Sequence, residues 1–298
     1  MSISLKNTTS SDIARAMVTA RIAAGSPAMD MVLTLLVVTD NDSVGEALQT
    51  AAILSREHPA RVLGIVLGDG RGAPRLDAKI RIGENSAGES VLLRLSGPLV
   101  KHADSVVLPL LLPDSPVVAW WPTNAPSDPS ADAIGQLAQR RLTDAESGPS
   151  PVRALKATAR HYTPGDTDLS WTRCTPWRAL LAAALDQSTG KVTGGSVEFS
   201  PGNPVATLLI AWLESRLNVP ITSRRGDKDQ ISEVVLHMAE GDVRIERIDP
   251  TSCHFSVPGT APREVPLGRR TLAELLAEDL RRLDADNIYA ATVKHLLA

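Results

Sequence analysis

The first half of the chain alternates between helical spacing and continuous runs of hydrophobic residues. Residues 11–24 place apolar side chains every three or four positions, which predicts an amphipathic helix. Residues 31–39 and 61–67 are unbroken apolar runs rich in β-branched residues, typical of strands buried on both faces. A helical pattern separates them, and Ser43 followed by Glu46 predicts a capping box at its start. This strand–helix–strand unit of about 30 residues predicts a parallel crossover.

The same alternation continues further along the chain. Strands are predicted at 89–95 and 116–121, with a helix within 98–112 between them. Residues 122–132 are rich in Pro, Ser, Asp and Asn, which predicts a loop. We therefore expect residues 1–165 to form an α/β domain with a mostly parallel, helix-covered sheet.

The second half of the chain has a different pattern. Residues 177–185 and 205–213 each place apolar side chains on one helical face, and residues 271–283 begin with a second predicted capping box. Between 221 and 267, short segments alternate apolar and polar residues, which is typical of antiparallel hairpins. We therefore expect residues 166–298 to form an α+β domain with antiparallel strands and helices.

Charge and composition exclude several classes of protein. The formal net charge is −3 and the arginine pairs, such as Arg140–Arg141, have acidic neighbours. We interpret these pairs as solvated faces and predict no nucleic-acid binding. The longest apolar run, 105–121, contains three prolines and is too interrupted to span a membrane. Two cysteines, Cys174 and Cys253, are too few for a secreted disulfide scaffold, so we expect a reducing, cytoplasmic location.

The motifs of common catalytic and cofactor sites are missing from the sequence. Gly68, Gly70 and Gly72 follow a predicted strand, but their spacing does not fit a dinucleotide fingerprint, and a loop is the favoured interpretation. The six histidines are scattered without metal-ligand spacing, and no G-x-S-x-G elbow occurs. We therefore predict a protein that is not an enzyme, with no catalytic residues, no metal and no cofactor.

Two polar segments are candidates for contact with a partner or a ligand. The first is SREHPAR at 55–61, which joins a predicted helix to a buried strand and contains Arg56 and His58. The interpretation as helix-end chemistry, in which a cation in the last turn complements the helix dipole, is somewhat favoured over a functional role.

The second candidate segment runs from Gly165 to Arg178 and is rich in Trp, Asp and Arg. Together with Trp120 and Trp121 it contains four of the five tryptophans of a chain with only 3% aromatic residues. Its candidate residues are Asp166, Asp168, Trp171, Arg173, Trp177 and Arg178. Three interpretations stay open: helix capping with core packing, a protein interface of the Trp–Arg type, and a sugar-binding pocket.

Several of these segments resemble the OpcA family of glucose-6-phosphate dehydrogenase assembly proteins, found in actinobacteria and cyanobacteria. The resemblance extends over nearly the whole chain from about residue 30 and is of the actinobacterial type. It rests on the following segments: SREHPAR (55–61), RLDA (75–78), VLLRLSG (91–97), LLPDSPVVAWWP (111–122), RLTDA (141–145), GDTDLSWTR (165–173) and LAEDLRRLDAD (276–286).

The resemblance implies a non-catalytic protein that binds glucose-6-phosphate dehydrogenase and promotes its assembly or active state. Such a protein would support the oxidative pentose phosphate pathway and NADPH supply. Redox control in some cyanobacterial members requires cysteines, but Cys174 and Cys253 lie far apart in the sequence. We therefore predict no thiol switch.

An alternative function is a phosphosugar- or nucleotide-binding sensor or enzyme. Its site would lie at the open end of the first sheet, where Arg56, His58 and Asp144 would supply the polar groups, and a small phosphosugar would be its ligand. The sequence leaves open whether such a ligand controls binding of the dehydrogenase.

Overall fold

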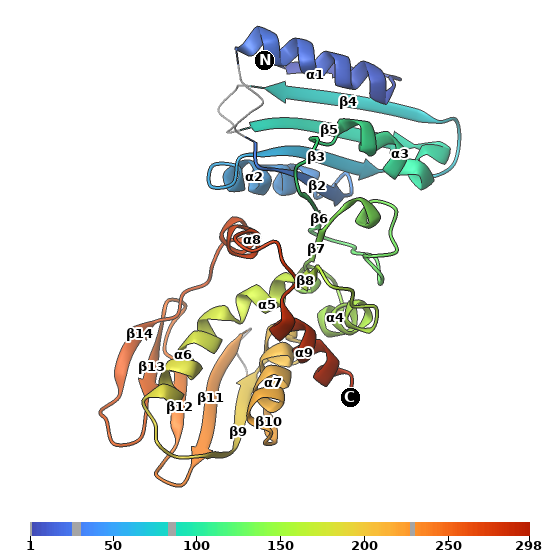
Figure 1. The fold of residues 1–298 in the computed structure, drawn as a ribbon. Coiled ribbons are helices and arrows are strands. Elements are labelled where there is room, and N and C mark those ends of the chain that lie inside the picture. Colours follow the sequence, from blue (N-terminus) through green and yellow to red (C-terminus); the bar gives the residue numbers. More distant parts are fainter. Residues whose placement is uncertain (1, 26–30, 83–87, 227–229) are drawn as a thin grey trace. The chain divides into compact units, whose positions relative to one another are not determined.

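The computed structural model describes residues 2–25, 31–82, 88–226 and 230–298 of the chain (Figure 1). The chain divides into two compact units, each of which combines segments that are distant in sequence. Unit 1 consists of residues 1–144, 163–167 and 272–285, and unit 2 consists of residues 145–162, 168–271 and 286–298. The division into domains 1–165 and 166–298 stays a prediction.

Unit 1 is built on an eight-stranded sheet in the order β1-β4-β5-β3-β2-β6-β7-β8. Its central strands, from β5 through β3, β2 and β6 to β7, are parallel, whereas β4 is antiparallel to both β1 and β5. The strands are β1 (Ser2–Leu5), β2 (Leu33–Thr39), β3 (Ala60–Leu67), β4 (Arg75–Ile82), β5 (Gly88–Ser96), β6 (Val117–Trp121), β7 (Arg140–Thr143) and β8 (Asp166–Asp168). The predicted parallel crossover, β2–α2–β3, and the mostly parallel sheet are both confirmed.

Helices cover the sheet of unit 1 on both faces. Helix α1 (Ser10–Ala24) buries Ile13, Met17 and Ala20, as the helical spacing predicts, and packs with α3 (Ala103–Val107) in an aliphatic core. Helix α2 (Val44–Leu54) packs on β2 and β3 and also contacts α8 (Leu272–Leu280). Short 3-10 turns, η2 (Gly97–His102) and η3 (Leu108–Leu110), flank α3, so the helix predicted within 98–112 is broken into three pieces.

The start of α2 differs from the predicted capping box. The Ser43 side chain makes no capping hydrogen bond. Instead, Asp40 Oδ1 accepts hydrogen bonds from the backbone amides of Asp42 (3.1 Å) and Ser43 (2.8 Å) just before the helix. The capping-box prediction was wrong because a carboxylate three residues upstream already binds the amide that precedes the helix.

Two strands were not predicted from the sequence in the first half of the chain. Strand β4 alternates exposed Arg75, Lys79 and Arg81 with buried Leu76 and Ile80. Because its charged residues interrupt every apolar pair, it does not form the continuous run that marks a strand buried on both faces. Strand β1 is only four residues long and pairs at the edge, next to β4.

Unit 2 has a six-stranded sheet packed against helices. The strand order is β10-β9-β11-β12-β13-β14, and all neighbours are antiparallel except β10 and β9, which are parallel. The strands are β9 (Val192–Phe199), β10 (Ile221–Arg225), β11 (Ile231–Met238), β12 (Val243–Arg247), β13 (Ser252–Ser256) and β14 (Arg263–Pro266). The predicted fold class, α/β followed by α+β, is confirmed.

The core of unit 2 lies between one face of this sheet and its helices (Figure 1). Leu181 and Leu208 come from two of the helices, and Val234, Ile245 and Phe255 come from three neighbouring strands. The helices of this unit are α4 (Pro151–Arg160), α5 (Leu169–Arg173), α6 (Thr175–Asp186), α7 (Pro204–Leu217) and α9 (Asn287–Leu296). Helices α6 and α7 correspond to the two predicted helical faces, whereas β9 and α9 were not predicted.

Candidate functional site

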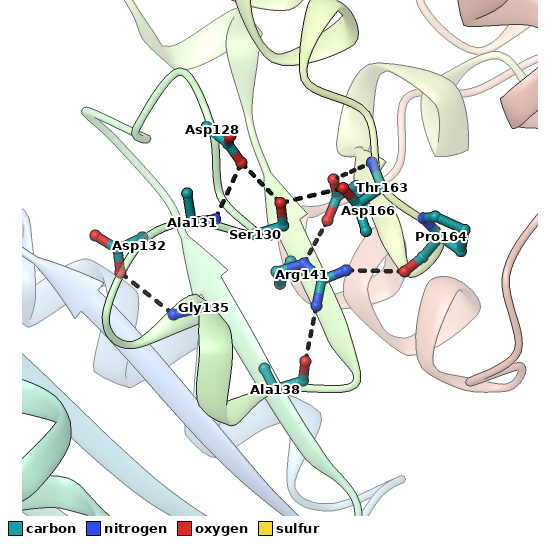
Figure 2. A network of polar contacts seen from close by, with 10 residues as sticks. All are labelled: Asp128, Ser130, Ala131, Asp132, Gly135, Ala138, Arg141, Thr163, Pro164 and Asp166. Atoms are coloured by element: carbon teal, nitrogen blue, oxygen red, sulfur yellow. Dashed lines mark hydrogen bonds and ion pairs between the residues drawn. The ribbon is translucent and has the colours of Figure 1, made fainter.

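A buried arginine on β7 organises a network of polar contacts in unit 1 (Figure 2). The Arg141 guanidinium donates from Nε to Asp166 Oδ1, from Nη1 to the carbonyl of Ala138 (2.8 Å) and from Nη2 to the carbonyl of Pro164 (2.8 Å). Arg141 is 7% exposed and Asp166 is 8% exposed. Each edge of the guanidinium therefore has an acceptor, which a buried charge requires.

The carboxylate of Asp166 extends this network toward the loop 122–132. Its second oxygen accepts from the backbone amide of Thr163 (2.8 Å), and the Thr163 hydroxyl contacts the Ser130 hydroxyl (3.1 Å), which donates to Asp128 (2.7 Å). Burial raises the pKa of Asp166, and the Thr163 amide and the Arg141 guanidinium oppose that rise. The predicted loop is thus held to the segment that begins the GDTDLSWTR motif.

Gly165 makes possible the close approach of the GDTDLSWTR segment to Gln139, which precedes β7. Its φ of +100° lies in a region that residues with a side chain rarely adopt. A Cβ atom at this position would lie 2.3 Å from the carbonyl oxygen of Gln139. Its own carbonyl accepts a hydrogen bond from the Arg141 amide (2.8 Å). The motif therefore requires glycine for reasons of backbone geometry.

The neighbouring Arg140 is buried as well, which corrects the prediction of a solvated Arg140–Arg141 face. Its Nε and Nη2 atoms both donate to Asp279 Oδ1 on α8, at 2.9 and 2.7 Å. Its Nη1 atom also contacts the carbonyl of Asp284 (3.3 Å). The prediction failed because the acidic neighbours in sequence are not the partners, and the carboxylate that accepts both bonds comes from a distant helix.

The SREHPAR segment lies at the end of α2 and holds the same helix α8. His58 Nε2 lies 3.2 Å from the carbonyl of Ala277, and Glu57 forms an ion pair with Arg281 at 3.0 Å. Arg56 is exposed. The segment therefore does more than complement the helix dipole, because it connects α2 to a helix more than 200 residues away in sequence.

Arg61, the last residue of that segment, belongs to a second buried ionic group. Its guanidinium contacts Glu89 at 2.8 Å and donates to the carbonyl of Leu110 (2.8 Å). Arg21 from α1 binds the other oxygen of Glu89. One carboxylate on β5 thus connects β3 and α1.

In unit 2, Asp168 begins the second part of the GDTDLSWTR segment. It is fully buried and is the N-cap of α5, where its side chain accepts from the Ser170 amide (2.9 Å) and from the Ala145 amide (2.9 Å). Asp144, which precedes Ala145, is also buried. The capping interpretation made from the sequence describes the Asp168 carboxylate.

Trp171 lies at the centre of an aromatic and ionic cluster in unit 2. The Arg178 guanidinium carbon lies 3.6 Å from the centre of the indole ring, and the indole Nε1 donates to Asp286 Oδ2 (2.8 Å). Tyr289 packs against the ring with centroids 5.7 Å apart. Burial lowers the pKa of Arg178, whose Nε finds no hydrogen-bond partner among the described residues.

The remaining contact candidates show different degrees of burial. The tryptophans at 120, 121, 171 and 177 are between 0 and 4% exposed. Arg173 keeps part of its side chain at the surface, where it pairs with Glu146 at 2.6 Å. The core-packing interpretation therefore describes where the indole rings lie, and a role of any candidate in partner contact stays a prediction.

Among the described residues, no group of three or more His, Cys, Asp or Glu side chains could hold a metal ion. Both cysteines are buried, and burial raises the pKa of Cys174 to about 12, which keeps its thiol protonated. In the part of the chain that the structure describes, no helix is long and apolar enough to cross a membrane.

Taken together, the geometry defines a two-unit α/β and α+β protein whose characteristic motifs bind one another. SREHPAR and LAEDLRRLDAD meet through His58 and Ala277, and RLTDA and GDTDLSWTR meet through Arg141 and Asp166. Residues 51–160 match the family described as glucose-6-phosphate dehydrogenase subunit N-terminal domain, and residues 164–293 match its C-terminal domain. The chain belongs to this family, OpcA.

Known relatives share part of the sequence. A Synechocystis sp. protein that carries the name OxPP cycle protein OpcA is 26% identical over 144 residues. The matched region is 43% of this chain but only 29% of that relative, so the chain spans under a third of its length. The crystal structure of an oxidoreductase from Sinorhizobium meliloti is similar with a TM-score of 0.43 and 11% identity, over 88% of this chain and 85% of that one.

Proposed function

We propose that this protein is a non-catalytic factor that binds glucose-6-phosphate dehydrogenase and promotes its active state. The observation that supports this function best is the match of both halves of the chain to the two domains of a glucose-6-phosphate dehydrogenase subunit family. The relative named for the OxPP cycle supports a place in the oxidative pentose phosphate pathway, and thereby in NADPH supply.

The chemistry of the segments that carry the family resemblance fits a binding role. Several of their carboxylates and guanidinium groups are paired with each other or with a neighbouring charge, as for Asp279 with Arg140 and for Asp166 with Arg141. Such pairs fix the shape of a surface, and a group held in one is not free for acid–base chemistry. A protein of this kind acts by binding one state of its partner more tightly than the others.

Of the predicted contact residues, four keep surface that a partner could reach. They are Arg56, His58, Arg173 and Arg178. Arginine is enriched at the energetically important positions of interfaces because its planar group combines hydrogen bonding with stacking. We propose these four as the contact residues among the original candidates.

The experiment is a titration of the purified chain into its cognate dehydrogenase. Sedimentation velocity measures the mass of the complex, and reduction of NADP⁺ measures the rate. We expect a complex at micromolar protein and a higher rate, or slower loss of activity when the dehydrogenase is diluted. The chain alone, with glucose 6-phosphate and NADP⁺, is the control and is expected to show no turnover. The proposal fails if neither mass nor rate changes with substrate present.

A further inference from the structure

One face of the sheet in unit 1 is covered over only part of its width. Helix α2 packs on β2 and β3, and α8 packs against α2. On the opposite face, α1 covers β4 through buried residues such as Ile80. On the α2 side, Lys79 and Arg81 of β4 and Arg94 of β5 are exposed, so no helix of the described residues covers these strands there. Three strands at about 4.8 Å spacing leave room for one helix, whose diameter is about 10 Å.

The uncovered strands and the flank of α2 form a groove of about 1050 Å³. Its floor carries the outward side chains of β4 and β5, among them Lys79, Arg81 and Leu92. Its wall is the side of α2 that presents Leu48 and Ala52. The groove therefore has an apolar wall and a floor that is polar along β4.

The groove carries an excess of positive charge. Among the described residues, four basic side chains line it, from Lys6, Lys79, Arg81 and Arg94, against one carboxylate, Asp77. That carboxylate is already bound by Arg75, which lies 2.9 Å away, and by the Asn7 amide at 2.8 Å. These contacts lower the pKa of Asp77, so it stays ionised and paired. Within the described part of the chain, Lys79 and Arg81 form no ion pair.

This basic excess contrasts with the protein as a whole, whose formal net charge is −3. A ligand of small size would need polar groups that converge on one point, whereas the cations of the groove are spread over β4, β5 and the residue after β1. An apolar wall beside a row of cations matches an amphipathic helix with an acidic edge, the helix-in-groove mode of recognition.

We propose that this groove binds an acidic amphipathic helix of a partner protein, which completes the helix layer over β5, β4 and β1. This inference rests on the function proposed above, according to which that helix belongs to glucose-6-phosphate dehydrogenase. The apolar side of the helix packs on Leu48 and Leu92, and its carboxylates face Lys79 and Arg81. Exposed charge pairs of this kind mainly accelerate association and are weakened by salt.

The test compares two groove variants with two matched controls in the full chain. Lys79→Glu combined with Arg81→Glu reverses the charge of the floor. Arg71→Glu combined with Lys101→Glu makes the same change in net charge at two exposed positions that do not line the groove. Ala52→Trp places a bulky side chain on the wall, where it obstructs the groove. Ile53→Trp places the same side chain at the neighbouring exposed position of α2, outside the groove. Thermal melting of each variant alone verifies that it is folded.

Affinity for the dehydrogenase, and its dependence on salt, are then measured by biolayer interferometry. Both groove variants are expected to bind about tenfold more weakly or worse, the charge variant mainly through slower association. The two controls are expected to bind like the original chain. Unchanged affinity of both groove variants would overturn this inference while leaving the proposed function standing, whereas no binding by the original chain would reject both.

Two further measurements separate other occupants of the groove. The melting temperature with inorganic phosphate or glucose 6-phosphate tests whether a small anion binds in the groove. If either compound raises the melting temperature of the original chain but not that of the charge variant, the occupant is a small anion and the proposed partner helix is wrong. Sedimentation of the chain alone tests a second copy of this chain. A dimer that both groove variants dissociate would likewise overturn the proposal.

Discussion

Arg140 and Asp279 form a buried ion pair across 139 residues of sequence. Two guanidinium nitrogens of Arg140 donate to the same carboxylate oxygen, and the side chains are 4% and 5% exposed. Helix α8 belongs to unit 1, although residues 168–271, which precede it, all belong to unit 2. This pair is therefore one of the contacts that hold α8 in unit 1.

We predict that Asp279→Asn lowers the free energy of unfolding by about 3–5 kcal/mol, since it leaves the Arg140 charge buried without its counter-charge. Urea denaturation measures the change. The double variant Arg140→Met with Asp279→Leu is the control and is expected to lose less than the single variant, because no charge is left buried. A loss below about 1 kcal/mol for Asp279→Asn would show that the pair does not hold α8.

Gly165 gives a second prediction about stability. A strained backbone conformation alone costs about 1–3 kcal/mol. We expect Gly165→Ala to lower the free energy of unfolding by more than this, because the added Cβ atom would also overlap the Gln139 carbonyl. Gly72→Ala is the control, since Gly72 also has a positive φ but open space around it. Equal losses in the two variants, measured by thermal unfolding, would contradict the close approach at Gly165.

The Trp171–Asp286 hydrogen bond gives a third prediction. Trp171→Phe keeps most of the ring but removes the indole N–H, and we expect a loss of about 1.5–3 kcal/mol, the usual range for a bond to a charged acceptor. Asp286→Ala is expected to cost more, because Asp286 also accepts from the amides of Ile288 and Tyr289 at the start of α9. If Asp286→Ala costs less than Trp171→Phe in chemical denaturation, the capping role is wrong.

The buried thiol of Cys174 leads to a prediction about reactivity. Cys174 Sγ donates to the carbonyl of Val205 (3.2 Å), and burial raises its pKa to about 12. We expect no reaction with a thiol reagent at pH 8 in the folded protein, and full reaction in urea, because only the exposed thiolate reacts. The variant Cys253→Ser isolates the signal of Cys174. Rapid labelling of the folded variant would show an accessible thiolate.

The turn between β12 and β13 gives a prediction about pH. Hydrogen bonds from Thr251 and Ser252 lower the pKa of Asp249 to about 2. Because this folded-state pKa lies below the unfolded value of about 3.9, the carboxylate contributes stability above about pH 4 that is lost as the pH falls through about 2. Carbon-13 NMR titration is expected to give a midpoint near 2, and a higher one in Thr251→Val. A midpoint near 4 in the original chain would contradict the bonding.

Periodicity predicted the elements whose burial is uniform. Strands β2 and β3 appear as unbroken apolar runs because both of their faces are covered, and α1 appears as a regular stripe because one of its faces is covered. Strand β4 was missed because the same rule fails for a strand with one uncovered face. That uncovered face is the floor of the groove, so the charged residues that hid β4 in the sequence are the same residues that make the groove basic.

Local spacing and residue type were enough to predict the fold class, the crossover β2–α2–β3 and the segments that carry the family resemblance. The partners of the charged residues, in contrast, follow only from the packing of segments that are distant in sequence. Arg140 was expected in solvent beside acidic neighbours, yet it is buried against Asp279, and Trp120 and Trp121 lie in the interior. A charge or an indole ring has the same local pattern in either place, and only packing between distant segments determines whether water or protein surrounds it.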